Sequence, residues 1–78
     1  MWRVVVFTYN HQGDAEKKAQ SVNQKHPNLN ASVFSPAGNG PYLVTLGGAM
    51  TREEAQQLRR KALREGMPRD SYIQNYKQ

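Results

Sequence analysis

Two stretches of this chain, WRVVVF at residues 2–7 and YLVTLG at residues 42–47, decide its fold. Both are rich in β-branched, aromatic and other apolar residues, which is typical of strands buried in a sheet. Each is followed by a helical stretch that carries an alanine at the matching position. A second short β-type run closes each half, ASVF at residues 31–34 and SYIQ at residues 71–74. The repeat predicts the element order β-α-β-β-α-β.

Local signals give the expected boundaries of these elements. Asp14 is the expected N-cap of the first helix, and Thr51 with Glu54 forms a capping box at the start of the second. Right-handed connections then give an α+β, ferredoxin-like fold, a four-stranded antiparallel sheet with both helices on one face. The first and third strands are expected in the middle of the sheet. The strands are expected at 2–8, 31–35, 41–47 and 70–76, and the helices at 14–25 and 52–65.

Alternation along the strands separates two faces of the sheet. The face toward the helices is expected to hold Trp2, Val4, Val6, Val33, Tyr42, Val44, Leu46 and Ile73. The open face is expected to hold Arg3, Val5, Phe7, Phe34, Leu43, Thr45, Tyr72, Gln74 and Tyr76. An exposed apolar surface of this kind marks an interaction site. Two alternatives stay open: the alternation is displaced by one residue, or something outside the chain covers this face.

Length and composition favour a single small domain. We expect residues 1–78 to form one domain, excised from a longer protein. The chain has no cysteine, so a disulfide framework and a cysteine-based metal site are excluded. Its longest apolar run, residues 4–7, is far shorter than the roughly 20 residues of a membrane helix, so no membrane insertion is expected. No signal peptide is recognisable, because Met1 leads straight into a strand pattern.

A net charge of +5 is concentrated late in the second helix, at Arg59, Arg60, Lys61 and Arg64. These side chains are either a solvated helix end that complements the helix dipole or a patch that attracts an anionic partner.

The residues for catalysis or for a cofactor are missing from the sequence. His11 and His26 are isolated from carboxylate pairs, and Gly47-Gly48 lacks the spacing and the lysine of a phosphate-binding loop, which favours a tight turn there. We therefore expect no enzyme activity, no cofactor and no metal. The fold class also includes RNA-recognition domains, whose third strand carries stacking aromatic residues. Leu43 and Thr45 stand on the open face here, so nucleic acid is not the expected partner.

Both halves resemble the SPOR domain, the sporulation-related repeat. WRVVVFTY at residues 2–9 is similar to the family's opening W-x-V-Q-x-G-S-F, and YLVTLGGAMTREEA at residues 42–55 is similar to Y-x-V-x-x-G-P-F-x-S-R-E-E-A. The similarity continues through Leu58, Gly66 and residues 68–73, so it covers essentially the whole chain.

The resemblance implies a non-catalytic module of the bacterial cell envelope, periplasmic or extracytoplasmic, that acts in cell division at the septum. It implies binding, through the open sheet face, to peptidoglycan glycan strands denuded of stem peptides. Removal of a stem peptide leaves a lactyl carboxylate, which the Arg3 guanidinium can pair with. Aromatic side chains can pack against the apolar faces of the sugar rings. The expected ligand-binding residues are Arg3, Val5, Phe7, Thr8, Tyr9, Phe34, Leu43, Thr45, Tyr72 and Gln74.

The chain departs from the family pattern at three positions. Val5 replaces a glutamine, Phe7 replaces a glycine, and Ala49 replaces an aromatic residue. A sheet face on which an amide side chain is replaced by a hydrocarbon side chain is less suited to binding sugar and better suited to binding another protein. The alternative function is therefore a protein–protein interaction domain that uses the same apolar face.

Overall fold

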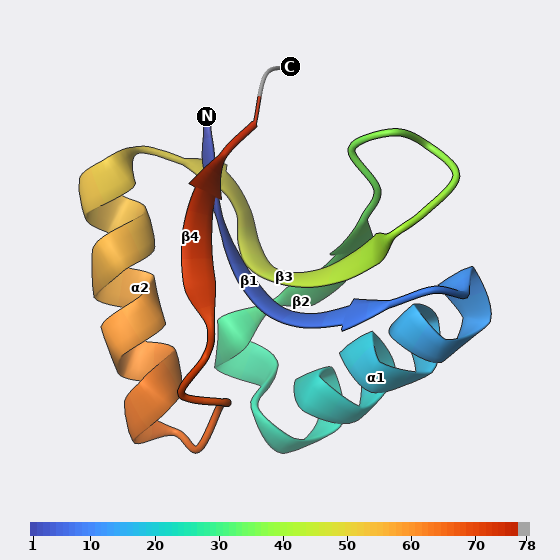
Figure 1. The fold of residues 1–78 in the computed structure, drawn as a ribbon. Helices are drawn as coiled ribbons and strands as arrows, with labels where there is room; N and C mark the ends of the chain where they lie inside the picture. Colours follow the sequence, from blue (N-terminus) through green and yellow to red (C-terminus); the bar gives the residue numbers. More distant parts are fainter. Residues whose placement is uncertain (77–78) are drawn as a thin grey trace.

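The computed structural model describes residues 1–76 and has the element order that the repeat predicts. Its elements are β1 (Trp2–Tyr9), α1 (Gln12–Lys25), a short 3-10 helix (Pro27–Leu29), β2 (Ala31–Phe34), β3 (Tyr42–Met50), α2 (Arg52–Arg64) and β4 (Tyr72–Asn75). The strands form one antiparallel sheet in the order β2-β3-β1-β4, so the first and third strands are central, as predicted. Figure 1 shows the sheet bending sharply, with α1 and α2 along the outside of the bend. The ferredoxin-like α+β fold is confirmed.

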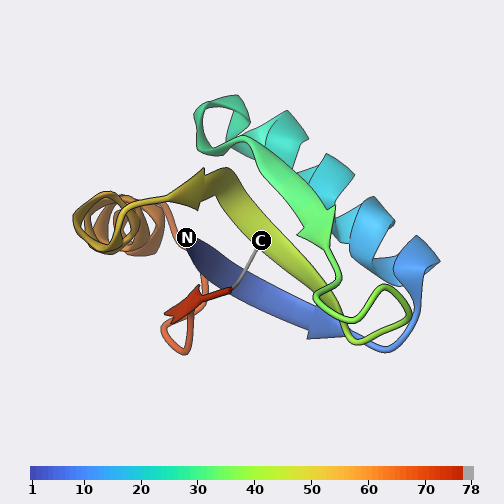
Figure 2. The same cartoon turned by 90° about the horizontal axis from the view of Figure 1, so that it is seen from above.

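Small side chains let the two helices approach the sheet closely. Ala15, Ala19 and Val22 of α1 and Ala55 and Ala62 of α2 are buried. Seen from above in Figure 2, α1 runs beside β2 and β3 while α2 lies at the other end of the sheet. The helices therefore cover different parts of one face and leave the inner side of the bend without a helix.

Several boundaries differ from the predicted ones. α1 begins at Gln12 with His11 as its N-cap, so Asp14 lies in the first turn and does not cap the helix. β4 is shorter than expected, and β3 continues to Met50. Gly47 and Gly48 therefore lie inside β3, both with positive φ, at an irregularity opposite Trp2–Val4, and do not form a separate turn. The capping box of Thr51 and Glu54 is present as predicted.

A β-bulge in β1 overturns the prediction that Phe7 and Tyr9 lie on the open face. Val5 is opposite Thr45, but Phe7 is opposite Val44, so the register shifts by one residue between them. Opposite residues share a face, and Val44 belongs to the core. Phe7 consequently packs on the helix side, where the Lys18 ammonium of α1 lies 4.5 Å from its ring centroid. Tyr9, opposite Tyr42, follows it to that side.

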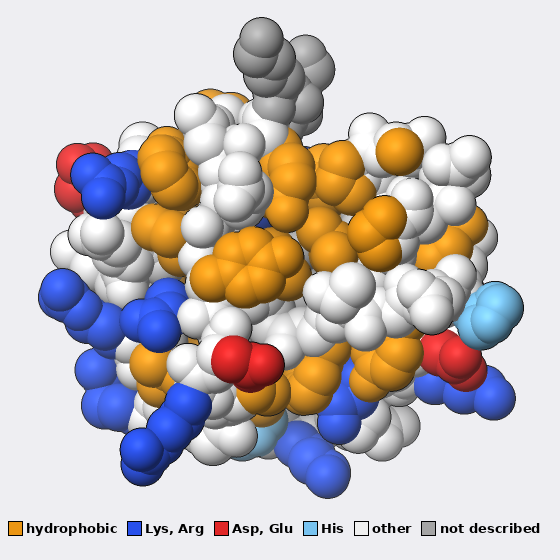
Figure 3. All heavy atoms as spheres, viewed as in Figure 1, with side chains coloured by type: hydrophobic (Ala, Val, Ile, Leu, Met, Phe, Trp, Pro, Cys, Tyr) orange, Lys and Arg blue, Asp and Glu red, His pale blue; other side chains and the backbone are white. Residues whose placement is uncertain are grey.

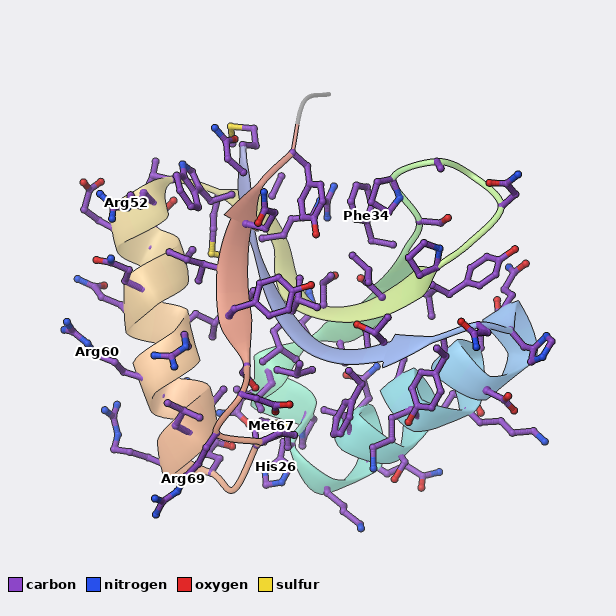
Figure 4. The ribbon with its side chains drawn as sticks, viewed as in Figure 1. His26, Phe34, Arg52, Arg60, Met67 and Arg69 are labelled. Atoms are coloured by element: carbon purple, nitrogen blue, oxygen red, sulfur yellow. The ribbon has the colours of Figure 1, made fainter. Side chains whose placement is uncertain are left out.

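Hydrogen bonds between side chains join the ends of the two helical segments. Glu65, just after α2, contacts His26 Nδ1 through Oε1 at 3.0 Å, and its Oε2 accepts a hydrogen bond from Asn28 Nδ2 at 3.0 Å. In Figure 4 the labels of His26 and Met67 mark the chain segments that follow α1 and α2. The Asn28 hydrogen bond, followed by the His26 contacts, holds the pKa of Glu65 below its usual value against the opposing effect of burial. This contact links the two halves of the repeat.

Glu65→Gln is expected to lower the thermal midpoint near neutral pH and to have progressively less effect in acid. The folded state depresses the pKa of Glu65, so the stabilisation is present above the ordinary glutamate range, about 4.3, and is lost as the pH falls through the lower folded-state pKa. Thermal melts of both proteins across that range measure the effect. Glu16→Gln is the control, because the Glu16 carboxylate accepts its hydrogen bond from Gln12 of the same helix. A midpoint difference for Glu65→Gln that is unchanged in acid contradicts the prediction.

Candidate functional site

The concave face of the sheet carries a row of side chains across all four strands. Ser32, Thr45, Val5 and Tyr72 are paired in that order from β2 to β4. Phe34 is opposite Leu43 in the next row, and Thr8 follows on β1. The expected positions of these residues on the face away from the helices are therefore correct.

Three of the residues expected on this exposed apolar surface are, however, buried. Val5 and Leu43 are only 1% and 4% exposed, and Thr45 is completely buried. Both helices lie on the other face, so these side chains are covered by neighbours on their own face. Arg3, Phe34 and Tyr76 contact one another on this face, and we call this group the lid. The expectation that Val5, Leu43 and Thr45 are exposed was wrong, because alternation assigns a side chain to a face of a sheet but does not determine how far its neighbours bury it.

The lid is held by stacking of charged and aromatic groups. The Arg3 guanidinium carbon lies 3.9 Å from the centroid of the Phe34 ring, a close cation–π contact. The Tyr76 ring meets Phe34 edge-on, with centroids 5.1 Å apart. Arg3 belongs to β1 and Phe34 to β2, and β3 lies between them, so the Arg3–Phe34 contact spans β3. Figure 4 shows Phe34 on the side of the sheet away from both helices.

Two polar atoms at the lid have no hydrogen-bond partner. They are Arg3 Nε and Thr45 Oγ1, both buried. Buried polar groups are nearly always hydrogen-bonded, so two such atoms on one face point to a group that the isolated chain does not supply. Within residues 1–76 no carboxylate pairs with Arg3. The guanidinium is therefore held in a fixed position with an uncompensated positive charge.

A cavity of about 420 Å³ opens along β1, where β4 stops pairing with it. Its lining includes the polar side chains of Thr8, Asp70 and Tyr72, and Tyr72 is 43% exposed. The other lining residues are Val5, Val6, Phe7 and Pro68. An apolar floor with a few polar groups at the rim is typical of a ligand site. Figure 3 shows hydrophobic side chains gathered over the centre of the viewed face.

The structure brings most of the predicted ligand-binding residues together, but not all. The concave face is lined by Arg3, Phe34 and Gln74. The cavity is bordered by Thr8 and Tyr72. The buried residues of the same face are Val5, Leu43 and Thr45. Phe7 packs on the helix side and also contributes to the lining of the cavity. Tyr9 lies on the helix side. Asp70 and Pro68 were not predicted as site residues. Both stand in the loop before β4, and no strand pattern indicates that this loop folds against β1.

The basic cluster of α2 divides into two roles. Arg59 Nε donates a hydrogen bond of 2.7 Å to the Ser71 carbonyl oxygen and so ties α2 to the start of β4. Arg60, Lys61 and Arg64 are exposed. Figure 4 shows Arg60 pointing away from the sheet, and Figure 3 shows cationic side chains gathered over α2. These charges are therefore remote from the lid.

The described residues offer neither a metal site nor a membrane-spanning helix. Among residues 1–76, no group of three or more histidine, cysteine, aspartate or glutamate side chains is arranged to hold a metal ion. In the same part of the chain, none of the helices has the length and apolar character needed to cross a bilayer.

The strands and helices together define a small β-α-β-β-α-β module whose concave sheet face carries no helix. The family model of the SPOR domain matches residues 1–74, and the chain belongs to the SPOR family. SPOR domains are septal peptidoglycan-binding modules that occur in proteins of the cell envelope. Comparisons with curated proteins and with solved structures gave no match.

Proposed function

We propose that this domain is a non-catalytic module that binds peptidoglycan glycan strands denuded of their stem peptides. Binding occurs on the concave face, between the lid and the cavity, and localises the parent protein to the septal wall outside the cytoplasm. The observation that carries the proposal is the position of Arg3 on the face of the sheet that no helix covers. Its Nε is buried, its guanidinium stacks on Phe34, and no carboxylate of residues 1–76 pairs with it.

Arg3 suits the chemical group that distinguishes a denuded strand. Removal of the stem peptide converts a neutral lactyl amide of each muramic acid into a carboxylate. A guanidinium binds a carboxylate through paired, charge-assisted hydrogen bonds. Stacking on Phe34 limits the rotamers of Arg3, so little conformational entropy is lost when the anion binds. An intact strand, which lacks that charge, gains no such contact.

The cavity supplies a complementary surface for a sugar ring. Tyr72 presents an exposed aromatic ring beside the apolar side chains of Val5 and Val6, and Thr8 and Asp70 offer a hydroxyl and a carboxylate at the rim. Aromatic and apolar surface packs against the C–H face of a pyranose, while the polar groups bind its hydroxyls. Arg3 and four residues of the cavity lining belong to β1, so a glycan strand that lies along β1 can contact both.

The residues that depart from the family pattern change the exposed surface of the concave face less than the sequence suggested. Val5 is buried, and Phe7 packs on the helix side. Within residues 1–76 the concave face therefore shows no exposed apolar patch of Val5, Phe7 and Leu43, which was the basis of the protein-interaction alternative. The groups available on this face are a cation, aromatic rings and hydroxyls, which favours glycan.

Retention on purified sacculi tests the proposal. We expect the domain to co-sediment with sacculi that contain denuded strands and to lose most of that retention after the strands are digested by a glycosidase specific for denuded glycan. Treatment with an amidase, which removes more stem peptides, is expected to increase retention. Equal retention on untreated, amidase-treated and digested sacculi contradicts recognition of denuded glycan.

A further inference from the structure

Tyr76 lies at the end of the pairing between β1 and β4, with its ring against Phe34. It follows β4, one position beyond Asn75, the last residue paired with β1. Its backbone N–H donates a hydrogen bond of 2.9 Å to the Met1 carbonyl oxygen, its own carbonyl oxygen accepts one of 3.1 Å from the Met1 nitrogen, and its ring packs edge-on against Phe34. The residue is therefore attached at the end of a four-residue edge strand. Strand ends of this kind open at low free-energy cost.

Two buried polar atoms of the concave face lack a hydrogen-bond partner. Thr45 Oγ1 and Arg3 Nε are buried and unpaired while the lid is closed. Burial raises the pKa of Tyr76, the proximity of Tyr72 raises it further, and Arg3 acts in the opposite direction. The Tyr76 ring thus lies among the same side chains, Arg3 and Tyr72, to which we assign the glycan.

We propose that Tyr76 is a displaceable cover of the binding surface, whose ring leaves Phe34 when a glycan strand binds. A sugar ring then takes its place against Phe34, and sugar oxygens supply partners for Thr45 Oγ1 and Arg3 Nε. This inference rests on the proposed function and adds that the closed lid competes with the ligand. It also assigns Thr45, which is fully buried in the closed state, to the bound surface.

Competition of this kind lowers the apparent affinity by the fraction of molecules whose lid is open. Tyr76→Ala removes the competing ring and is expected to bind a denuded glycan oligosaccharide about two- to tenfold more tightly, the range that one aromatic pair contributes. Tyr76→Phe is the matched control. It keeps the ring against Phe34 and is expected to bind like the wild type.

Two measurements separate this inference from the proposed function. Titration with a purified denuded oligosaccharide gives the affinity of each variant, and NMR cross-relaxation between the Phe34 and Tyr76 rings reports the lid. We expect this cross-relaxation in the free protein and its loss at saturation, with new contacts from Phe34 to sugar protons. Binding with the ring contact intact, or Tyr76→Ala no tighter than the wild type, overturns the cover while leaving glycan binding in place. Absence of binding by all three proteins overturns the proposed function and, with it, the cover.

Discussion

Replacing Leu29 with alanine is expected to remove about 3–5 kcal/mol from the free energy of unfolding. Leu29 is only 1% exposed and is among the largest fully buried side chains of the domain, where it joins the core cluster of both helices and the sheet. A domain of 78 residues has a total stability of about 4–12 kcal/mol. One cavity at this position therefore removes between about a quarter and all of this stability, and we expect a thermal midpoint well below that of the wild type.

Leu63→Ala is the matched control for this prediction. It removes the same atoms from a half-buried residue of α2 that lies outside the core cluster. Alanine also has the higher helix propensity, so the expected loss is at most about 1 kcal/mol. Urea denaturation of the two variants and the wild type measures both values. Similar losses for the two substitutions contradict the assignment of Leu29 to the core.

Leu29 also shows why part of the core was not recognisable from the sequence. It is flanked by Pro27, Asn28 and Asn30, which are residues of turns and helix ends, so no periodic pattern includes it. Periodicity identifies core residues within strands and helices, but Leu29 is buried by a 3-10 turn that folds under the sheet after α1. The capping box of α2 was predictable, because Thr51 and Glu54 interact over three residues.

The binding face was predictable in its outline but not in its surface. Strand order follows from the repeat and from the handedness of the connections, so Arg3, Phe34 and Tyr72 were placed on the correct face. The side of Phe7 was not predictable, because a bulge depends on how β1 and β3 pair and not on the sequence of β1 alone. Closure of the lid depends on contacts between distant parts of the chain, and alternation within one strand carries no information about them.

Arg3→Gln is expected to reduce affinity for denuded glycan about ten- to a hundredfold. The loss of a hydrogen bond to a charged group costs about 1.5–3 kcal/mol, and each factor of ten corresponds to about 1.4 kcal/mol. Glutamine keeps a polar side chain at the position but removes the charge that distinguishes a denuded strand from an intact one. Titration with a purified denuded oligosaccharide measures the change, and thermal melts establish that the variant is folded.

Arg60→Gln separates recognition by Arg3 from general attraction to a basic protein. It lowers the net charge by the same amount, on an exposed residue of α2 that points away from the sheet. If Arg3 reads the lactyl carboxylate, Arg60→Gln retains near wild-type affinity and Arg3→Gln does not. Equal losses for the two variants, both suppressed by added salt, would instead mean that the positive charge of the domain attracts the polymer without a specific contact. Because the two substitutions are chemically identical, a difference between them arises from the environment of Arg3, its contact with Phe34 and its unpaired Nε.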